Sequence, residues 1–245
     1  MDGVLWRQTT PLVDMPGLFD NFSRANIKVM LATNNGTATI DQYVQKLAGF
    51  EVQVEAWQVV TSAMALGHLL KKYYPEGGPV YITGEKALHD TLADYGFYHS
   101  SDNPQAVASG LSRDLSYTML KDTSLMIQKG LPFYFTNPDT TYPTPEGIVP
   151  GAGTMLAALE AASGVKAQLA GKPLPFLFEV CLERLKTSPQ ETLVVGDRLD
   201  TDILGGQKSG CKTALVLTGI STRAEADQWT PKPDLVLEKA SDLFE

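Results

Sequence analysis

The chain has 245 residues, of which 43% are hydrophobic, and its formal net charge is −8. This length fits one large domain or two modest ones, and the hydrophobic share is ordinary for a globular protein. The acidic balance argues against a broad nucleic-acid-binding face and against binding to an anionic membrane surface. It does not exclude a small anionic substrate, because a metal ion and a few local donors can outweigh the overall charge.

Three further features bear on the cellular compartment. Cys181 and Cys211 are the only cysteines, which is too few for a disulfide framework and favours a reducing compartment. No apolar run reaches transmembrane length. The opening residues Met1-Asp2-Gly3 lack the basic and apolar regions of a signal peptide. We therefore expect a cytoplasmic protein with no nucleic-acid partner and no membrane partner.

The first third of the chain alternates between helix and strand patterns. Residues 27–32 predict a strand that ends at Thr33-Asn34-Asn35, which carries small polar donors. The run 75–79, Pro-Glu-Gly-Gly-Pro, is the clearest break in composition, and we place a domain boundary there. Helices are predicted over residues 15–25, 39–47 and 57–74.

A smaller α/β module is predicted to follow this break, because strand and helix patterns alternate again. One of its strands ends at Thr136-Asn137-Pro138-Asp139, and the proline-rich segment 141–150 is predicted to be irregular. Strands are predicted over 80–83, 106–109 and 132–135, and helices over 85–95, 116–129 and 153–163.

The first pattern resumes near Val165. Residues 168–170 predict a short strand that ends at Gly171-Lys172-Pro173, and residues 192–195 predict a fully buried strand that stops at Gly196. Further helices are predicted over 174–185 and 201–209, and further strands over 213–217 and 234–237. Repeated strand–helix alternation indicates a parallel sheet with right-handed crossovers. The predicted fold class is α/β, with a Rossmann-like parallel-sheet core from residues 1–76 and 167–245 and an inserted α/β cap domain over residues 77–166.

Three carboxylates follow the buried strand 192–195: Asp197, Asp200 and Asp202. Ligands of parallel α/β sheets bind outside the carboxyl ends of the strands, so we expect these side chains to crowd one crevice. Like charges that close raise each other's pKa unless a cation lies among them, and Mg²⁺ prefers such oxygen ligands. The alternative is a loop whose Asp side chains cap a helix near Thr201. Spacing alone leaves both interpretations open.

Other strand ends are expected to meet at the same edge of the sheet. Lys172 offers a positive charge for a phosphate group. The Thr33 hydroxyl and the backbone N–H groups that follow it offer hydrogen bonds to phosphate oxygens. Asp197 offers a metal ligand, and Asp202 is suited to orient the metal shell or Lys172. Together these groups predict a site for a phosphorylated ligand and a divalent metal ion.

These motifs, in this order, resemble those of the haloacid-dehalogenase-like phosphatase superfamily over nearly the whole chain. The matching segments are Asp2-Gly3-Val4-Leu5-Trp6, Thr33-Asn34-Asn35, Gly171-Lys172-Pro173 and Gly196-Asp197-Arg198-Leu199-Asp200-Thr201-Asp202. The insert lies where that superfamily carries its large α/β cap. Within it, Thr136-Asn137-Pro138-Asp139, Pro143-Thr144-Pro145 and Pro150-Gly151-Ala152-Gly153-Thr154 are similar to the NagD-like branch. That branch includes 4-nitrophenylphosphate, phosphoglycolate and pyridoxal-phosphate phosphatases.

The resemblance implies Mg²⁺-dependent hydrolysis of small phosphomonoesters through an aspartyl-phosphate intermediate. It implies that Asp2 and Lys172 are catalytic and that the metal residues are Asp2, Asp197 and Asp202. Phosphate or substrate binding is implied for Thr33, Asn34, Asn35, Lys172, Asn137 and Asp139. For Asn137 and Asp139, an Asx-turn is the alternative interpretation. The physiological substrate is not predicted, because its choice depends on cap side chains.

The first motif departs from the family pattern. The family sequence is Asp-x-Asp-Gly, and Met1 occupies the x, so Asp2 matches the acid/base carboxylate. The matching nucleophile would lie one residue before Met1, together with the strand that leads into it. We favour a start placed at an internal Met codon over a pseudoenzyme. The structure is therefore expected to show either a sheet without its middle strand or other residues in its place, and this polypeptide is not expected to turn over by the family mechanism.

Several alternatives stay open. The first is a non-catalytic phosphate-ligand-binding pseudoenzyme of the same fold, and another is a plain dinucleotide-binding fold, although Gly151-Ala152-Gly153 lacks the third glycine of that motif. The three histidines are too scattered to predict a zinc site. Trp6 and both cysteines are expected to be packing residues. The Ala-rich helix over 154–162 suggests a homodimer through the cap, beside the simpler interpretation of a face buried within the chain.

Overall fold

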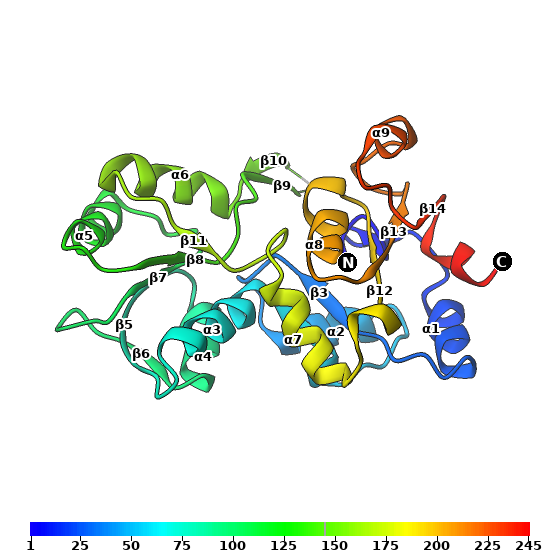
Figure 1. Cartoon of the computed structure of the whole chain (residues 1–245), viewed down its shortest axis with the longest axis horizontal. Coiled ribbons are helices and arrows are strands. Elements are labelled where there is room, and N and C mark those ends of the chain that lie inside the picture. Colours follow the sequence, from blue (N-terminus) through cyan, green and yellow to red (C-terminus); the bar gives the residue numbers. More distant parts are fainter. Residues whose placement is uncertain (145) are drawn as a thin grey trace. The chain divides into compact units, whose positions relative to one another are not determined.

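The computed structural model describes residues 1–144 and 146–245, and contacts divide them into two compact units (Figure 1). Unit 1 comprises Met1–Ala32, Ile40–Val60 and Lys172–Glu245, and unit 2 comprises Thr33–Thr39 and Thr61–Gly171. Each unit is described by itself. No helix in the described ranges is both long enough and apolar enough to cross a membrane.

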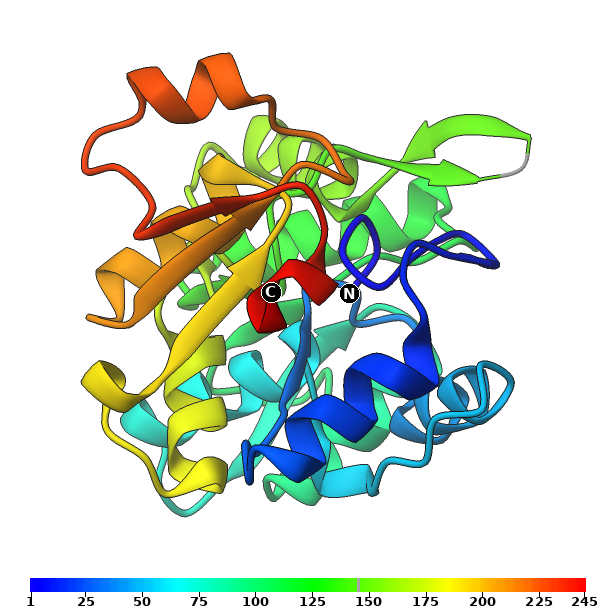
Figure 2. The same cartoon turned by 90° about the vertical axis from the view of Figure 1, so that its right-hand side faces the viewer.

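Unit 1 contains a parallel sheet in the order β12-β13-β14, which appears side by side from yellow to red in Figure 2. Its strands are β12 (Leu193–Gly196), β13 (Lys212–Val216) and β14 (Leu235–Leu237). A separate two-stranded sheet joins β3 (Leu31–Thr33) to β4 (Val59–Thr61), the last residue of each belonging to unit 2. A short hairpin joins β1 (Trp6–Arg7) to β2 (Thr10–Pro11). The predicted parallel α/β architecture is therefore present.

Two helices of unit 1 begin at residues whose side chains cap them. Asp14 accepts a hydrogen bond from the Gly17 N–H at the start of α1 (Met15–Arg24), and Thr222 caps α9 (Arg223–Gln228). The other helices are α2 (Ile40–Ala48), α7 (Phe176–Leu185) and α8 (Leu204–Lys208). Short helical turns are η1 (Ala56–Gln58), η2 (Pro189–Glu191), η3 (Leu199–Ile203) and η4 (Ala240–Phe244).

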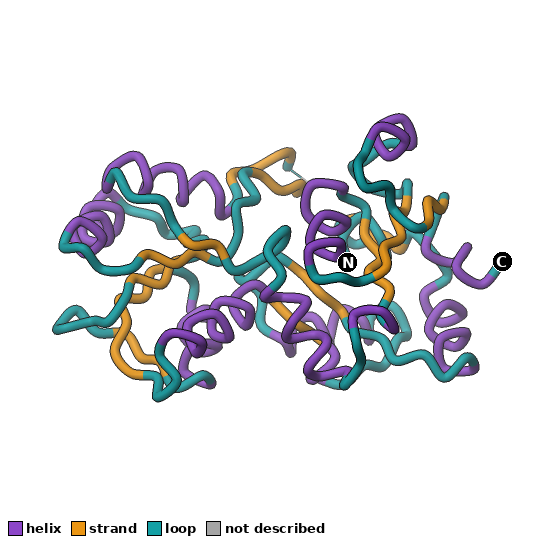
Figure 3. Tube along the Cα trace, viewed as in Figure 1, coloured by secondary structure: helices purple, strands orange, loops and turns teal. Residues whose placement is uncertain are grey.

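Unit 2 is built on a five-stranded, all-parallel sheet in the order β11-β8-β7-β5-β6 (Figure 3). Its strands are β5 (Gly78–Thr83), β6 (Phe97–His99), β7 (Val107–Ser109), β8 (Phe133–Phe135) and β11 (Gln168–Leu169). Its helices are α3 (Ser62–Tyr73), α4 (Lys86–Asp94), α5 (Tyr117–Gln128) and α6 (Ala152–Ser163). One face of α6 buries Met155, Leu156 and Leu159 in the core of the unit. The interpretation of α6 as an internally packed helix is thus supported, and a dimer through this helix stays a prediction.

Periodic, capped segments agree with the sequence prediction to within two residues at each end, and less regular ones do not. The predicted helix 57–74 contains β4, because the β-branched run Val59-Val60-Thr61 pairs with β3 before α3 begins. The segment 141–150, expected to be irregular, forms a hairpin of β9 (Thr141–Thr144) and β10 (Gly147–Pro150). Pro145 of the cap motif lies outside the described residues.

The boundaries between the two units differ from the predicted boundaries between core and cap. The predicted core includes residues 168–170, yet β11 pairs with β8 and thereby extends the sheet of unit 2. The unit boundary at Val60–Thr61 also precedes the Pro/Gly break, because α3 packs against α4 and brings its Gly67 against Tyr95. Composition marks the break in the chain, whereas packing decides which sheet each segment joins.

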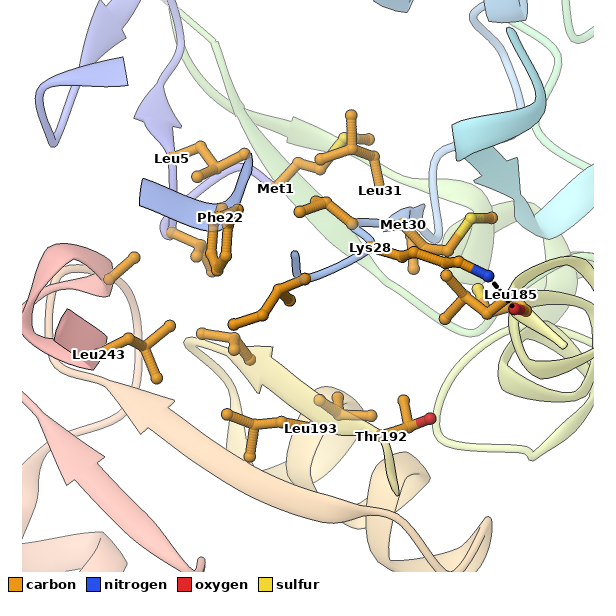
Figure 4. Close-up of a pocket in the computed structure, with 18 of the residues that line it drawn as sticks. Met1, Leu5, Phe22, Lys28, Met30, Leu31, Leu185, Thr192, Leu193 and Leu243 are labelled. Carbon is orange, nitrogen blue, oxygen red and sulfur yellow. Dashed lines mark hydrogen bonds between the residues drawn. The ribbon is translucent and has the colours of Figure 1, made fainter. Parts of the chain in front are cut away.

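A cavity of about 710 Å³ lies within unit 1 between β3 and β12 (Figure 4). Residues Lys28–Ala32 line one side, and residues 192–195 line the other. Within the described residues, β3 pairs with β4 and β12 with β13, and neither pairs with the other. The prediction of a sheet without its middle strand is confirmed.

Two details of the predicted strands follow from this cavity. The predicted strand 27–32 is regular only from Leu31, because residues 27–30 have no neighbouring strand and instead border the cavity. The strand 192–195 was expected to be fully buried, but Leu193 is 37% exposed. Leu193 lines the cavity, which explains its exposure.

Candidate functional site

A buried ion pair stands at the centre of the candidate site in unit 1. Lys172 directly precedes the turn into α7, and Asp202 lies in η3, which follows β12. The Lys172 Nζ donates a hydrogen bond of 2.7 Å to Asp202 Oδ1, and each side chain is 10% exposed. Asp202 Oδ2 accepts a second hydrogen bond of 3.2 Å from the Arg198 N–H. Burial opposes ionisation of Asp202, but Lys172, the Met1 amino group and these hydrogen bonds outweigh it and lower the pKa of this carboxyl.

Asp197 is a second buried carboxylate, at the carboxyl end of β12. Its Oδ2 accepts a hydrogen bond of 3.1 Å from the Ile220 N–H, and its backbone carbonyl accepts one of 3.0 Å from the Ser221 N–H. Burial raises the pKa of Asp197, and repulsion from Asp202 adds to this rise. Lys172 acts on the same carboxyl in the opposite direction. Lys172, Asp197 and Asp202 therefore form one electrostatic cluster, as predicted, although β11, the strand before Lys172, belongs to the sheet of unit 2.

The first residues of the chain form a tight loop beside this cluster. The Met1 carbonyl accepts hydrogen bonds from the N–H groups of Val4 and Leu5, and the Thr218 hydroxyl donates one of 2.6 Å to the Gly3 carbonyl. The Asp2 side chain is exposed. Burial, followed by repulsion from Lys172, lowers the pKa of the Met1 amino group. The loop thus brings Asp2 and a chain-terminal amino group to the carboxyl end of β12.

Glycine at position 3 leaves room for the Asp197 carboxylate. Gly3 has φ +75°, a left-handed conformation that favours glycine. A Cβ atom at this position would collide with the Asp197 carboxylate, and so would one at Gly219. The carboxylate therefore lies in a narrow cradle that any side chain at these two positions would fill.

Asp197 is the residue of this cluster that could contribute a carboxylate ligand to a magnesium ion. Mg²⁺ is usually bound by one or two carboxylates, with water and phosphate oxygens as the other ligands. Asp197 is a buried carboxylate whose pKa is raised, so a nearby cation would stabilise its charged form. Among the described residues there is no group of three or more His, Cys, Asp or Glu side chains that could hold a metal ion. An ion at this position would need oxygen ligands besides protein carboxylates.

Asp200 does not join the cluster, which corrects the expectation that three carboxylates crowd one crevice. Its side chain is 63% exposed and pairs with Arg198 at 2.9 Å. The turn η3 directs Asp202 inward and leaves Asp200 at the surface. Ser221 also contacts this turn, since its hydroxyl accepts a hydrogen bond of 3.0 Å from the Leu199 N–H.

The Thr33-Asn34-Asn35 turn belongs to unit 2 and is held by side-chain hydrogen bonds. The Thr33 hydroxyl oxygen accepts a bond of 3.1 Å from the Asn35 N–H. Asn35 Oδ1 accepts bonds from the N–H and the hydroxyl of Thr37, at 2.9 and 2.7 Å. Arg113 in turn donates a bond of 3.0 Å to the Thr37 hydroxyl. Sequence reasoning missed Arg113, because it lies 76 positions from Thr37 in the chain.

Asn34 and Asn137 come together within unit 2 around Gly171. A Cβ at Gly171 would lie 2.7 Å from Asn34 Oδ1 and 3.1 Å from the Asn137 Cβ. Asn137 Nδ2 donates a hydrogen bond of 3.1 Å to Asp139 Oδ2, and its Oδ1 accepts one of 3.0 Å from the Thr136 hydroxyl. Both asparagines are buried. These polar residues thus adjoin Gly171, whose next neighbour in the chain is Lys172.

Other candidates from the sequence pack as expected. Trp6 is buried and stacks on Phe50, with ring centroids 5.7 Å apart. Cys181 and Cys211 are buried free thiols, and burial raises the pKa of Cys181 to about 12. The His89 and His99 rings lie 5.8 Å apart, a proximity that their sequence spacing did not suggest.

Replacing Gly3 by alanine is expected to destabilise the protein more than the same change at Gly164. Both glycines have nearly the same φ, +75° and +73°, so the backbone cost of roughly 1 to 2 kcal/mol should be shared. Only Gly3 faces a carboxylate, whereas a Cβ at Gly164 meets nothing within 4 Å. Chemical denaturation of the two variants measures the difference. Equal destabilisation would show that the cradle around Asp197 tolerates a methyl group.

Replacing Asp197 by asparagine is expected to raise the melting temperature in metal-free buffer at neutral pH. The pKa of Asp197 is higher in the folded state than in the unfolded state. The negative charge of Asp197 therefore destabilises the folded state above the unfolded-state pKa. This destabilisation disappears as the pH falls through the folded-state pKa. The gain should therefore shrink toward acidic pH, and stabilisation by Mg²⁺ should be lost in the variant. Thermal unfolding between pH 5 and 8, with Asp200→Asn as the exposed control, measures both effects. A variant that Mg²⁺ stabilises as strongly as the parent would exclude Asp197 as a ligand.

Comparisons with known proteins match two parts of the chain to family models. Residues 1–98 match a family model described as haloacid dehalogenase-like hydrolase, and residues 169–243 match one described as HAD-hydrolase-like. The chain is 32% identical to dihydroxyacetone phosphatase from Corynebacterium glutamicum (strain R), over 99% of this chain and 88% of that protein.

Two solved structures are similar over most of the chain. NagD from E. coli K-12 superposes with a TM-score of 0.91 at 30% identity, covering 99% of this chain and 95% of that one. Glycerol phosphate phosphatase from Mycobacterium tuberculosis in complex with magnesium has a TM-score of 0.88 at 33% identity. That match covers 96% of this chain and 72% of the relative.

Proposed function

This chain belongs to the haloacid dehalogenase-like hydrolases, in the branch of NagD and the 4-nitrophenylphosphatases, and is a phosphatase by family; we propose that its substrates are small phosphorylated sugars or polyols. The names of two relatives support this substrate class, since one is a dihydroxyacetone phosphatase and another a glycerol phosphate phosphatase. A phosphate ester of a few carbon atoms is common to both names.

The observation that carries the proposal is the buried pair of Lys172 and Asp202 beside Asp197. Lys172 is suited to bind phosphate oxygens, because its ammonium is a fixed point charge in a desolvated place. Asp202 keeps that ammonium in position through the 2.7 Å hydrogen bond. Asp197, and the loop at Asp2, would hold Mg²⁺, which when bound neutralises charge on the transferring phosphoryl group.

The remaining roles follow from the family resemblance and belong to the proposal. Asp2 would donate a proton to the leaving oxygen and then activate water, and its exposed carboxyl is free to reach a substrate. Thr33, Asn34 and Asn35 would bind the phosphate, and Asn137 and Asp139 would contact the rest of the substrate. Residues 77–166 would act as the cap that excludes water from the reaction and chooses the substrate.

A phosphate-binding protein without turnover is the second candidate function. Met1 is the residue before Asp2, so residues 1–245 supply no carboxylate at the family's nucleophile position. Covalent phosphoryl transfer needs an attacking atom in line with phosphorus. The binding groups Lys172 and Asp197 do not depend on that atom, so this candidate retains them.

An assay of binding beside turnover separates the two functions. Calorimetry with inorganic phosphate, with and without Mg²⁺, measures binding, and hydrolysis of 4-nitrophenyl phosphate and of glycerol phosphate measures turnover. We expect Mg²⁺-dependent phosphate binding by residues 1–245, with turnover at most weak. Rapid Mg²⁺-dependent turnover would eliminate the binding-only function, and absence of phosphate binding would overturn both.

A further inference from the structure

A relay of hydrogen bonds within unit 2 ends at the Asn35 side chain. It begins at Arg113, whose Nη2 donates to the Thr37 hydroxyl oxygen at 3.0 Å. The Thr37 hydroxyl in turn donates to Asn35 Oδ1 at 2.7 Å. A guanidinium group has no acceptor and a hydroxyl has one proton. The hydroxyl must therefore accept from Arg113, and its own proton is directed at Asn35.

This relay fixes the direction of the Asn35 amide. The Thr37 backbone N–H is a donor only, and it lies 2.9 Å from Asn35 Oδ1, so the carbonyl end of the amide must face Thr37. With two donors on its oxygen, the amide turns its N–H2 group to the opposite side. The Asn35 side chain is exposed, and its N–H2 group donates to no residue that the structure describes. The turn therefore offers two amide donors to a ligand.

Arg113 is itself tied to the start of α4. Its backbone N–H donates a hydrogen bond of 2.8 Å to Glu85 Oε1, and its Nη1 lies 3.5 Å from the same oxygen. The Glu85 N–H donates a bond of 3.1 Å to the Leu111 carbonyl. These bonds join the loop between β7 and α5 to the residue that precedes α4. The guanidinium thus reaches Thr37 from an anchored loop, although the Arg113 side chain is 55% exposed.

A separate contact holds the backbone of the turn. The hydroxyl of Ser62, the buried first residue of α3, donates to the Asn34 carbonyl. A Cβ at Gly36 would lie 2.9 Å from the Ser62 Oγ, so the backbone of the turn lies close against α3. Ser62 therefore acts on the backbone, whereas the relay from Arg113 acts on the Asn35 side chain.

We propose that Arg113 is a positioning residue for phosphate recognition, which acts through Thr37 to present the N–H2 group of Asn35, and not its carbonyl, to the phosphate. The inference rests on the proposed function, in which Asn35 binds the phosphate group. Ionised phosphate oxygens accept hydrogen bonds, so the amide is useful there only when its donors face the ligand. Without Arg113 the Thr37 hydroxyl is free to rotate, and the amide loses one of the two bonds that set its direction.

Calorimetry with inorganic phosphate and Mg²⁺ tests the relay as a unit. Arg113→Met and Thr37→Val should each weaken phosphate binding about tenfold, and the double variant should bind no more weakly than either. Thr37→Ser keeps the hydroxyl and should bind within about twofold of the parent. Lys86→Met removes another exposed cation of unit 2, one that pairs with Asp90, and should bind like the parent. The melting temperature of Arg113→Met should fall by less than about 4 °C, because exposed ion pairs contribute little stability.

Replacing Asn35 by aspartate tests the direction of the amide. The carboxylate keeps an acceptor for both Thr37 donors but puts an oxygen in place of the N–H2 group. Phosphate binding should fall at least about 100-fold, because like charges then face each other. Hydrogen exchange at the Thr37 N–H, resolved by NMR, measures the relay without any ligand. It should accelerate about tenfold in Arg113→Met and stay unchanged in Asn35→Asp and in Lys86→Met.

Three results would overturn the inference. Phosphate binding at parental affinity in Arg113→Met, or unchanged exchange at Thr37 in that variant, would show that Arg113 does not control the turn. Additive losses in the double variant would show that Arg113 acts through its charge and not through Thr37. Phosphate binding by Asn35→Asp at parental affinity would show that the amide donors do not face the ligand. Absence of phosphate binding in the parent would overturn the proposed function, because the exchange difference tests the relay without a ligand.

Discussion

Adding the segment Ile-Val-Val-Leu-Val-Asp directly before Met1 is expected to raise hydrolysis of 4-nitrophenyl phosphate by on the order of 10³-fold or more. The extended sequence would read Asp-Met-Asp-Gly, with the new carboxylate two positions before Asp2. The Met1 amino group interacts electrostatically with Lys172, Asp197 and Asp202. Replacing this ammonium by a peptide bond and a carboxylate would supply the attacking atom that phosphoryl transfer requires.

The matched control carries asparagine in place of the added aspartate. It keeps the length of the added segment, its apolar residues and the peptide bond, so the two forms differ only in the added carboxylate. Steady-state kinetics with and without Mg²⁺ compares the pair. Similar rates for the aspartate and asparagine forms would rule out this position as the nucleophile.

Lys172→Met is expected to abolish phosphate binding and to lower the melting temperature by about 10 °C. Removing one partner of a buried ion pair leaves a charge without compensation, at a cost of about 3–5 kcal/mol, and 1 kcal/mol shifts the melting temperature of a protein this size by about 2–4 °C. Lys172 is the largest of the influences that lower the pKa of Asp202 in the folded state. The ion pair of Lys172 and Asp202 therefore stabilises the folded state at pH values above the unfolded-state pKa of Asp202. That contribution is lost as the pH falls through the lower folded pKa.

The double variant Lys172→Met with Asp202→Asn separates binding from stability. Neutralising Asp202 removes the uncompensated charge, so much of the stability should return while phosphate binding stays absent. Thermal unfolding and phosphate calorimetry on the two single variants and the double variant complete the cycle. Phosphate binding at parental affinity in Lys172→Met would remove this residue from the proposed site.

The predicted helices agree with the structure where apolar periodicity and caps coincide. Ser116 caps α5 and Asp14 caps α1, and the sequence shows both signals. Short strands were harder to predict. β4 lies directly before α3 in one apolar run, and only its pairing with β3 distinguishes it from helix. β11 has two residues, and its membership of unit 2 depends on a partner 34 positions earlier, Gln168 facing Tyr134.

The candidate site was predictable where strand ends determine it. Asp197 and Asp202 gather because both follow the carboxyl end of β12. Lys172 joins them although β11, the strand before it, belongs to the sheet of unit 2. The outward direction of Asp200 depends on the local winding of η3, which spacing does not reveal. The bond from Arg113 to Thr37 and the packing of Asn34 beside Asn137 depend on tertiary contacts between distant segments. Sequence motifs thus predict the residues of the candidate site, and tertiary packing determines which other residues hold them in position.

The cavity between β3 and β12 offers a way to alter unit 1 without replacing any residue of its charged cluster. Leu31 and Leu193 border the cavity and carry no charge. Larger side chains at these two positions would reduce the volume of the cavity while Lys172, Asp197 and Asp202 are kept.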